Sequence, residues 1–318
     1  MSTLLNAIRE GGRNWISEAD VQRIRAVPHF RDSEHAGQCG GDNLQTTFGW
    51  YLTHFVEEIF KFQPDINIRS VADIGTGYGW LAIALALKTQ TRIVAVEYDE
   101  RKLAAARQIA GIFGVAQRIE WCVASIGRLP FGEQEFDFTF CIEVIEHIAD
   151  NIEITQDLAR ITKDLLVITT PNKIFPIIRH DTSLPCCHWL PPGRLRDWYA
   201  AAFGRKGQQE NNRFWSPGKL LSAIPDFERA SAFLQFRTYK DYLAAERRLY
   251  GIEGEVNGLT KAAQRTYYQG VSWAGKKSIY FLPNLASIFR RRPQTVLSDR
   301  GVRGASKRTD SPAAPAEK

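Results

Sequence analysis

Acidic residues and alternate glycines lie together in an order that suits a nucleoside ligand. Asp73 ends a short apolar run and precedes Gly75, Gly77 and Gly79. Glycines let the backbone turn tightly and let a ligand approach it closely. Glu97 ends the next apolar run, about twenty residues on, where one carboxylate can accept the hydroxyl bonds of a ribose. A carboxylate at Asp73 would repel a pyrophosphate, so we expect a cationic or amino-bearing ligand rather than a dinucleotide.

The same residues also have an interpretation without a ligand. The glycines would then form only a tight turn, and Glu97 would cap the helix that starts near Glu100. The occurrence of both features in register around one predicted strand, turn and helix favours the binding site.

A second group of residues with acid–base chemistry follows the fourth apolar run. Glu143 lies three residues before Glu146 and four before His147, so we expect one helical turn to put all three side chains on one face. An imidazole titrates near neutral pH and suits a general base. His147 is the first candidate and His188 the second. Alternatively, the two carboxylates cap the helix that follows.

Apolar runs define the elements that must hold these groups. Three predicted helices, 80–87, 100–113 and 151–161, alternate with five runs typical of buried strands, 70–74, 92–97, 119–123, 135–142 and 164–170. This alternation predicts a doubly wound α/β fold. Because such sheets bind ligands at the carboxyl ends of their strands, both groups of residues should meet at one edge.

The regions on either side of these strands have weaker patterns. Apolar residues that recur at spacings of three and four predict a helix over 44–60. Residues 173–215 are rich in aromatic side chains and prolines, and we expect them to form the pocket for a second substrate. Further along, we predict a helix at 217–223, a strand at 230–236, a helical region at 238–270 and a last strand at 278–282.

In this order, the motifs resemble those of the class I S-adenosylmethionine (SAM) dependent methyltransferases. Besides Glu97, three stretches carry the resemblance: the acid and glycines of 73–79, the segment ASIGRLPF at 124–131 and the run LVITTPN at 166–172. The resemblance covers about residues 44–172. It implies an α/β fold with a Rossmann-like, seven-stranded class I methyltransferase sheet and helical insertions after strands five and six.

The resemblance also implies SAM as the cofactor and indicates which residues contact it. These are Asp73, Gly75, Gly77, Gly79, Glu97, Tyr98, Ser125, Ile126 and Glu143. In the family, an acid at the position of Ser125 accepts the adenine amino group, and a hydroxyl is the weaker acceptor. The implied catalytic residues are His147, Glu143, Glu146 and His188.

Together these residues favour a SAM-dependent methyltransferase that methylates an oxygen of a small-molecule, sugar or lipid acceptor. One alternative is a metal-dependent O-methyltransferase for a quinone precursor or an RNA 2′-hydroxyl, because residues 143–147 resemble a metal-binding E-x-x-E-H motif. His188 would then be a further ligand. Mg²⁺ usually keeps several waters, so we expect no metal here. The other alternative is a non-catalytic SAM-binding regulatory partner, for which only Ser125 argues.

We expect four regions along the chain. They are an N-terminal helical segment (1–43), the SAM-binding Rossmann-like core (44–172), substrate-pocket insertions with the C-terminal part of the sheet (173–283), and a basic, largely disordered tail (284–318).

The composition is that of a soluble globular protein of 318 residues with a net charge of +6. There is no transmembrane segment, since no run of 18 apolar residues is free of charge, and there is no signal-peptide pattern. The five cysteines are odd in number, which favours a reducing, cytoplasmic location. The basic tail suits peripheral contact with a membrane, and nucleic acid is the less favoured partner.

Overall fold

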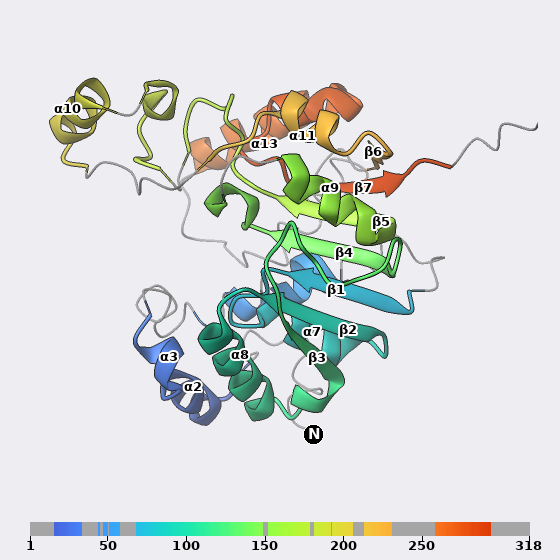
Figure 1. Cartoon of the computed structure of the whole chain (residues 1–318). Helices are drawn as coiled ribbons and strands as arrows, with labels where there is room; N and C mark the ends of the chain where they lie inside the picture. Colours follow the sequence, from blue (N-terminus) through green and yellow to red (C-terminus); the bar gives the residue numbers. More distant parts are fainter. Residues whose placement is uncertain are drawn as a thin grey trace, which may run out of the picture.

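The computed structural model of the chain describes residues 16–33, 44, 47–49, 51–57, 68–148, 152–178, 181–191, 193–205, 213–230 and 258–293. Within them, one sheet of seven strands runs through the centre and helices cover both of its faces (Figure 1). The strand order is β3-β2-β1-β4-β5-β7-β6. The strands are β1 (Ser70–Ile74), β2 (Arg92–Glu97), β3 (Ile119–Val123), β4 (Phe136–Ile142), β5 (Thr162–Thr169), β6 (Phe227–Arg229) and β7 (Ser287–Arg291).

Successive side chains of each strand point to opposite faces of the sheet, and both faces are apolar. In β1, Val71 joins the core that contains α7 (Trp80–Lys88) and α8 (Glu100–Ile112). Ala72 belongs instead to the core that contains α9 (Ile152–Ile161) and α11 (Pro217–Ala223). Burial on both sides explains why the central strands are continuous apolar runs in the sequence.

The order of the strands reverses between β1 and β4. β1 pairs in parallel with β2 on one side and with β4 on the other. In an open α/β sheet, such a switch point leaves a crevice at the carboxyl ends of the two central strands. Gly75 directly follows β1 and Glu143 directly follows β4, so the topology brings the two predicted groups of functional residues to one edge.

Further helices precede and follow these strands. α2 (Glu18–Arg25) and α3 (Pro28–Arg31) pack against α8, and the π-helix η1 (Tyr51–Glu57) packs against α7. The remaining ones are η2 (Ala116–Arg118), η3 (Ile145–His147), η4 (Cys187–Trp189), α10 (Arg194–Ala202), α13 (Gly258–Trp273) and η5 (Gly275–Tyr280). In the described part of the chain, no helix combines the length and the apolar character needed to cross a bilayer.

The fold class and the five strands predicted between residues 70 and 170 are confirmed. Each of these strands begins and ends within two residues of its prediction. The antiparallel strand β7 lies between β5 and β6 and completes the seven-stranded sheet that the methyltransferase resemblance implies.

The last two strands lie at other residues than predicted. The run 278–282 begins inside the 3-10 helix η5, and β7 comes later, at Ser287–Arg291. A short apolar run does not by itself distinguish a strand from a buried helical turn, and here Pro283 follows it at once. The sixth strand is Phe227–Arg229 rather than 230–236, and residues 231–236 lie outside the described residues.

Part of the predicted basic tail belongs to the sheet. Arg291 is the last residue of β7, and its Nε donates to the carbonyl of Thr162 at 3.1 Å. Its guanidinium also lies 4.5 Å from the ring centroid of Phe227. The segment predicted as tail from residue 284 therefore begins within the sheet. Residues 294–318 and most of the predicted helical region 238–270 lie outside the described residues.

Candidate active site

The turn after β1 needs glycine for two different reasons. Gly75, Gly77 and Gly79 all have positive φ angles, of 73°, 58° and 81°, which other residues rarely adopt. A Cβ at Gly75 would lie 2.5 Å from Cγ2 of Val144, so only glycine fits against the loop after β4. A Cβ at Gly77 would meet nothing within 4 Å. The turn is therefore packed on one side and open at its centre.

Asp73 stabilises this turn from its buried side. Its carboxylate is buried, and its Oδ2 accepts a hydrogen bond of 2.6 Å from Oγ1 of Thr76. Burial raises the pKa of Asp73 to about 7, although the bonds from Thr76 and from the backbone of Ala82 lower it. Asp73 was predicted to contact the cofactor, but it does not line the cavity described below. Asp73 instead positions Thr76, which does line the cavity.

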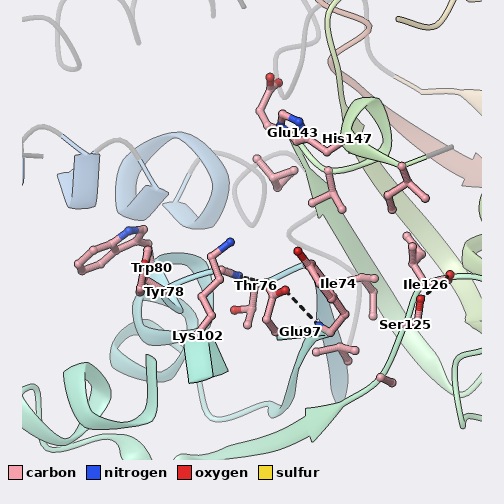
Figure 2. A pocket seen from close by; sticks show the side chains of 18 of the residues that line it. Ile74, Thr76, Tyr78, Trp80, Glu97, Lys102, Ser125, Ile126, Glu143 and His147 are labelled. Carbon is pink, nitrogen blue, oxygen red and sulfur yellow. Dashed lines mark hydrogen bonds between the residues drawn. The ribbon is translucent and has the colours of Figure 1, made fainter. Parts of the chain in front are cut away.

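Glu97 connects the end of β2 to the same turn. One carboxylate oxygen accepts the N–H of Gly77 at 3.0 Å, and the other accepts the N–H of Tyr98 at 3.1 Å. Figure 2 shows Glu97 beside Thr76 on the wall of the cavity. The first oxygen, Oε2, keeps a lone pair for a further bond, whereas Oε1 also accepts the N–H of Asp99 at 3.4 Å. Glu97 is therefore oriented by the backbone and still able to accept a ribose hydroxyl.

A cavity of about 940 Å³ opens along this edge of the sheet. Its volume is near the upper end of the usual range for ligand sites, about 300–1,000 Å³, and it leaves room for a second ligand beside a nucleoside. It is lined by Thr47, Tyr51, Ile74, Gly75, Thr76, Gly77, Tyr78, Trp80, Val96, Glu97, Tyr98, Lys102, Ala124, Ser125, Ile126, Ile142, Glu143, Val144, His147 and Ile148.

Glu143 and His147 form the part of the wall that follows β4, and Figure 2 shows them close together. Glu143 has a φ of 54°, which is unusual for a residue with a side chain. Its N–H is held by the carbonyl of Thr169 at 3.0 Å, at the end of the neighbouring strand. A residue in this conformation costs about 1–3 kcal/mol, and such residues cluster at active sites.

Glu146 points away from the cavity into the core. Its side chain is fully buried, and its Oε2 accepts a bond of 3.0 Å from Oγ1 of Thr170. Burial, and then the charge of Glu143, raise the pKa of Glu146 to about 9, so it carries a proton at neutral pH. The predicted single helical turn over residues 143–147 is wrong, because the 3-10 turn of η3 comprises only Ile145–His147. Glu146 Oε1 still lies 4.0 Å from Nε2 of His147.

His188 is not brought to the cavity. It lies in η4, where its Nε2 donates to the carbonyl of Lys173 at 2.9 Å. Its ring lies edge-on to the rings of Trp189 and Phe214, and burial lowers its pKa. Among the described residues of 173–215, the segment predicted to form an acceptor pocket, none lines the cavity. That role for the segment stays a prediction.

The metal-binding alternative lacks its ligands in the described residues. No three His, Cys, Asp or Glu side chains among them are grouped so that they could hold an ion. Two of the expected ligands have other partners. Glu146 accepts a hydrogen bond from Thr170, and His188 donates one to the backbone carbonyl of Lys173.

Of the remaining predicted cofactor residues, some line the cavity and one does not. Tyr98, Ser125 and Ile126 line the cavity, and Tyr98 is 74% exposed, so its ring is free to stack on a base. Gly79 does not line it. A Cβ there would lie 3.3 Å from that of Ala106, so this glycine serves the packing of α7 on α8.

Some lining residues were not predicted from the sequence. Thr76 could have been found, because a hydroxyl three residues after a buried acid is a natural partner for it. Lys102 also carried a signal, since a cation in the first turn of a helix opposes the helix dipole. Tyr51 lies on a π-helix, a form frequent at functional sites but not readable from residue spacing.

The chain is similar in sequence to known methyltransferases. Residues 71–164, from β1 to the start of β5, match the methyltransferase domain family. A probable S-adenosylmethionine-dependent methyltransferase of Mycobacterium tuberculosis is 29% identical over 127 residues, which are 39% of this chain and 43% of that protein. A methyltransferase of Streptomyces halstedii is 28% identical over 162 residues, 51% of this chain and 57% of its own length.

Among solved structures, an S-adenosylmethionine-dependent methyltransferase from Mesorhizobium loti covers 74% of this chain and 96% of its own, with 15% identity and a TM-score of 0.45. The family assignment comes from the sequence matches and from the strand order. The chain spans about half the length of the curated relatives it matches.

The fold is an α/β sheet with a cavity at its switch point, and Glu97 and Glu143 line that cavity after β2 and after β4. Residues 71–164 match a methyltransferase domain, and over this part the chain is similar to SAM-dependent methyltransferases, whose cofactor is SAM.

Proposed function

We propose that this protein transfers the methyl group of SAM to a hydroxyl of a small-molecule, sugar or lipid acceptor that binds beside Glu143 and His147. One observation carries the proposal. A single cavity joins the glycine turn and Glu97 on one wall to Glu143 and His147 on the other. A nucleoside cofactor and an acceptor can therefore lie in contact with each other in the same space.

The residues of the cavity fit SAM. Glu97 would accept the ribose hydroxyls, the open backbone at Gly77 would lie against the methionine part, and Tyr98 would stack on the adenine. Ser125 and Ile126 would contact the edge of the adenine. When bound, the cofactor supplies a methyl group on a positively charged sulfur. The acceptor would attack the methyl carbon in line with the carbon–sulfur bond, and the sulfur would leave as a neutral thioether.

The chain itself positions the acceptor and removes its proton. The side chain of His147 is half exposed, and its Nε2 lies 4.0 Å from Oε1 of the buried Glu146. A neutral imidazole is the form that accepts a proton from a hydroxyl. Ile142, Val144 and Ile148 also line the cavity on this wall and give the acceptor apolar surface to pack against.

Methyl transfer from labelled SAM to panels of hydroxylated small molecules, sugars and lipids tests the proposal. We expect His147→Gln to lower kcat about 10²–10⁴-fold, as for loss of a general base, with SAM affinity unchanged. His188→Gln, which changes the other predicted base, should keep its rate because His188 lies outside the cavity. Full activity in His147→Gln would refute the role of the base.

A further inference from the structure

Helix α10 turns a row of large apolar side chains to solvent and one of its arginines to the protein. Leu195, Trp198 and Phe203 are 60%, 68% and 62% exposed. Arg196, in contrast, is buried, and its Nη2 donates to Oδ1 of the buried Asp181 carboxylate at 2.6 Å. A surface helix of a soluble domain normally shows the opposite arrangement.

The exposed apolar residues form one stripe. Leu195 and Trp198 are three positions apart, and Phe203 follows at the C-cap, eight positions after Leu195, so all three lie on one side of the helix. Asp197 lies about 200° around the helix from Leu195, at 100° per residue, and so points away from the stripe. We call the three residues of the stripe, with Arg194 and Arg205 at its ends, the α10 face.

The α10 face lies in a segment whose exposed surface is apolar and basic. Over the described part of residues 173–205, the exposed cations are Lys173, Arg194 and Arg205, and the one exposed acid is Asp197. The same segment also exposes large apolar side chains, those of Ile174, Ile177 and Trp189. Its other carboxylate, Asp181, is already paired with Arg196.

The position of α10 places this face at the outside of the molecule. Figure 1 shows α10 standing away from the sheet, beyond the edge at which β1, β4 and β5 end. That edge carries the cavity. On the protein side, α10 packs on η4, with Ala200 and Cys187 in a small apolar cluster of their own. The cluster holds the helix in place and leaves the outer stripe uncovered by described residues.

We propose that the α10 face docks on an anionic lipid surface. The Leu195, Trp198 and Phe203 side chains would enter the boundary between headgroups and acyl chains, and Arg194 and Arg205 would contact the lipid phosphates. Short helices with Trp, Leu and Phe on one side and arginines beside them bind membranes in this way. The charge argues for anionic lipid, because cations flank the stripe and the acid of the helix faces away from it. This inference does not depend on the proposed function.

Vesicle sedimentation with the full chain tests the proposal. The vesicles are phosphatidylcholine alone, or phosphatidylcholine with about 30% phosphatidylglycerol to supply the negative surface. We expect the protein to sediment with the anionic vesicles only, and the double variant Leu195→Ser/Trp198→Ser to bind at least about tenfold more weakly. Trp273→Ser is the matched control, since Trp273 is 81% exposed on α13, outside the α10 face, and its loss should change nothing.

The arginines have their own readout. Arg194→Gln/Arg205→Gln should weaken binding to anionic vesicles and flatten its dependence on salt concentration. Circular dichroism and SAM affinity equal to those of the wild type show that each variant is folded.

Three outcomes would overturn the proposal. The first is no sedimentation of the wild type with anionic vesicles, and the second is equal binding by the Leu195→Ser/Trp198→Ser and Trp273→Ser variants. The third is a wild-type dimer that the double variant dissociates, without vesicle binding, which would assign the face to a second copy of the chain.

Discussion

Gly75 lies where the cofactor turn touches the loop that carries Glu143, and its replacement tests that contact. A Cβ at this position would lie 2.5 Å and 2.8 Å from the two methyl carbons of Val144. Gly77 provides the matched control, because its φ of 58° is also left-handed but a Cβ there meets open space. Alanine at Gly77 should therefore cost only the backbone strain, about 1–2 kcal/mol. Alanine at Gly75 should add an overpacking cost of about 1–3 kcal/mol, for a total of about 2–5 kcal/mol.

Urea denaturation measures both costs. It is applied to the wild type, to Gly75→Ala, Gly77→Ala and Val144→Ala, and to the double variant Gly75→Ala/Val144→Ala. Val144→Ala removes both methyl groups and leaves the nearest remaining side-chain atom, Cβ, 3.2 Å away. The double variant should therefore recover most of the overpacking cost, with a coupling free energy of about 1–3 kcal/mol. Equal losses for Gly75→Ala and Gly77→Ala, or additive effects of Gly75→Ala and Val144→Ala, would refute the contact between the two loops.

Two further predictions concern the buried carboxyls. As pH rises from about 5 toward 9, folded Glu146 keeps its proton while the unfolded chain loses it, so the wild-type free energy of unfolding should fall by up to about 1.4 kcal/mol per pH unit. Glu146→Gln cannot lose a proton at this position. The free energy of unfolding of this variant, minus that of the wild type, should therefore increase as pH rises. A difference independent of pH would show that Glu146 is not protonated in the folded protein. Thr76→Val removes the hydroxyl that binds Asp73 and should cost about 1–3 kcal/mol in thermal or urea unfolding. Thr266→Val, which loses only an exposed bond within α13, is its control, and equal costs would count against the role given to Thr76.

The central strands could be predicted from the sequence because they are buried on both faces. Such strands are continuous apolar runs that end at turn residues, as at Gly75 after β1 and at Asp99 after β2. The end of the chain lacked this signal. β7 ends in Arg290 and Arg291, which by charge alone belong to a basic tail, and only the pairing with β5 and β6 identifies them as part of a strand.

For the site, residue types and spacing identified the strand ends but not the directions of the side chains. Glu97 and Gly77 were predicted to lie at the ligand, and the structure places both on the cavity. Glu143 and Glu146 looked equivalent in the sequence. The left-handed backbone of Glu143 delays the helical turn, so that Glu143 lines the cavity while the side chain of Glu146 is fully buried. That conformation is set by the packing of the loop, which residue spacing does not record.

SAM binding to the purified chain, measured by calorimetry, tests the central claim most directly. We expect the wild type to bind and Glu97→Ala to lose about 1.5–3 kcal/mol, which is about 10- to 150-fold in Kd, because charged hydrogen bonds to the ribose are lost. Glu100→Ala removes the same charge from an exposed position three residues away and should bind like the wild type. No binding by the wild type, or equal affinities for Glu97→Ala and Glu100→Ala, would contradict the assignment of this cavity to SAM.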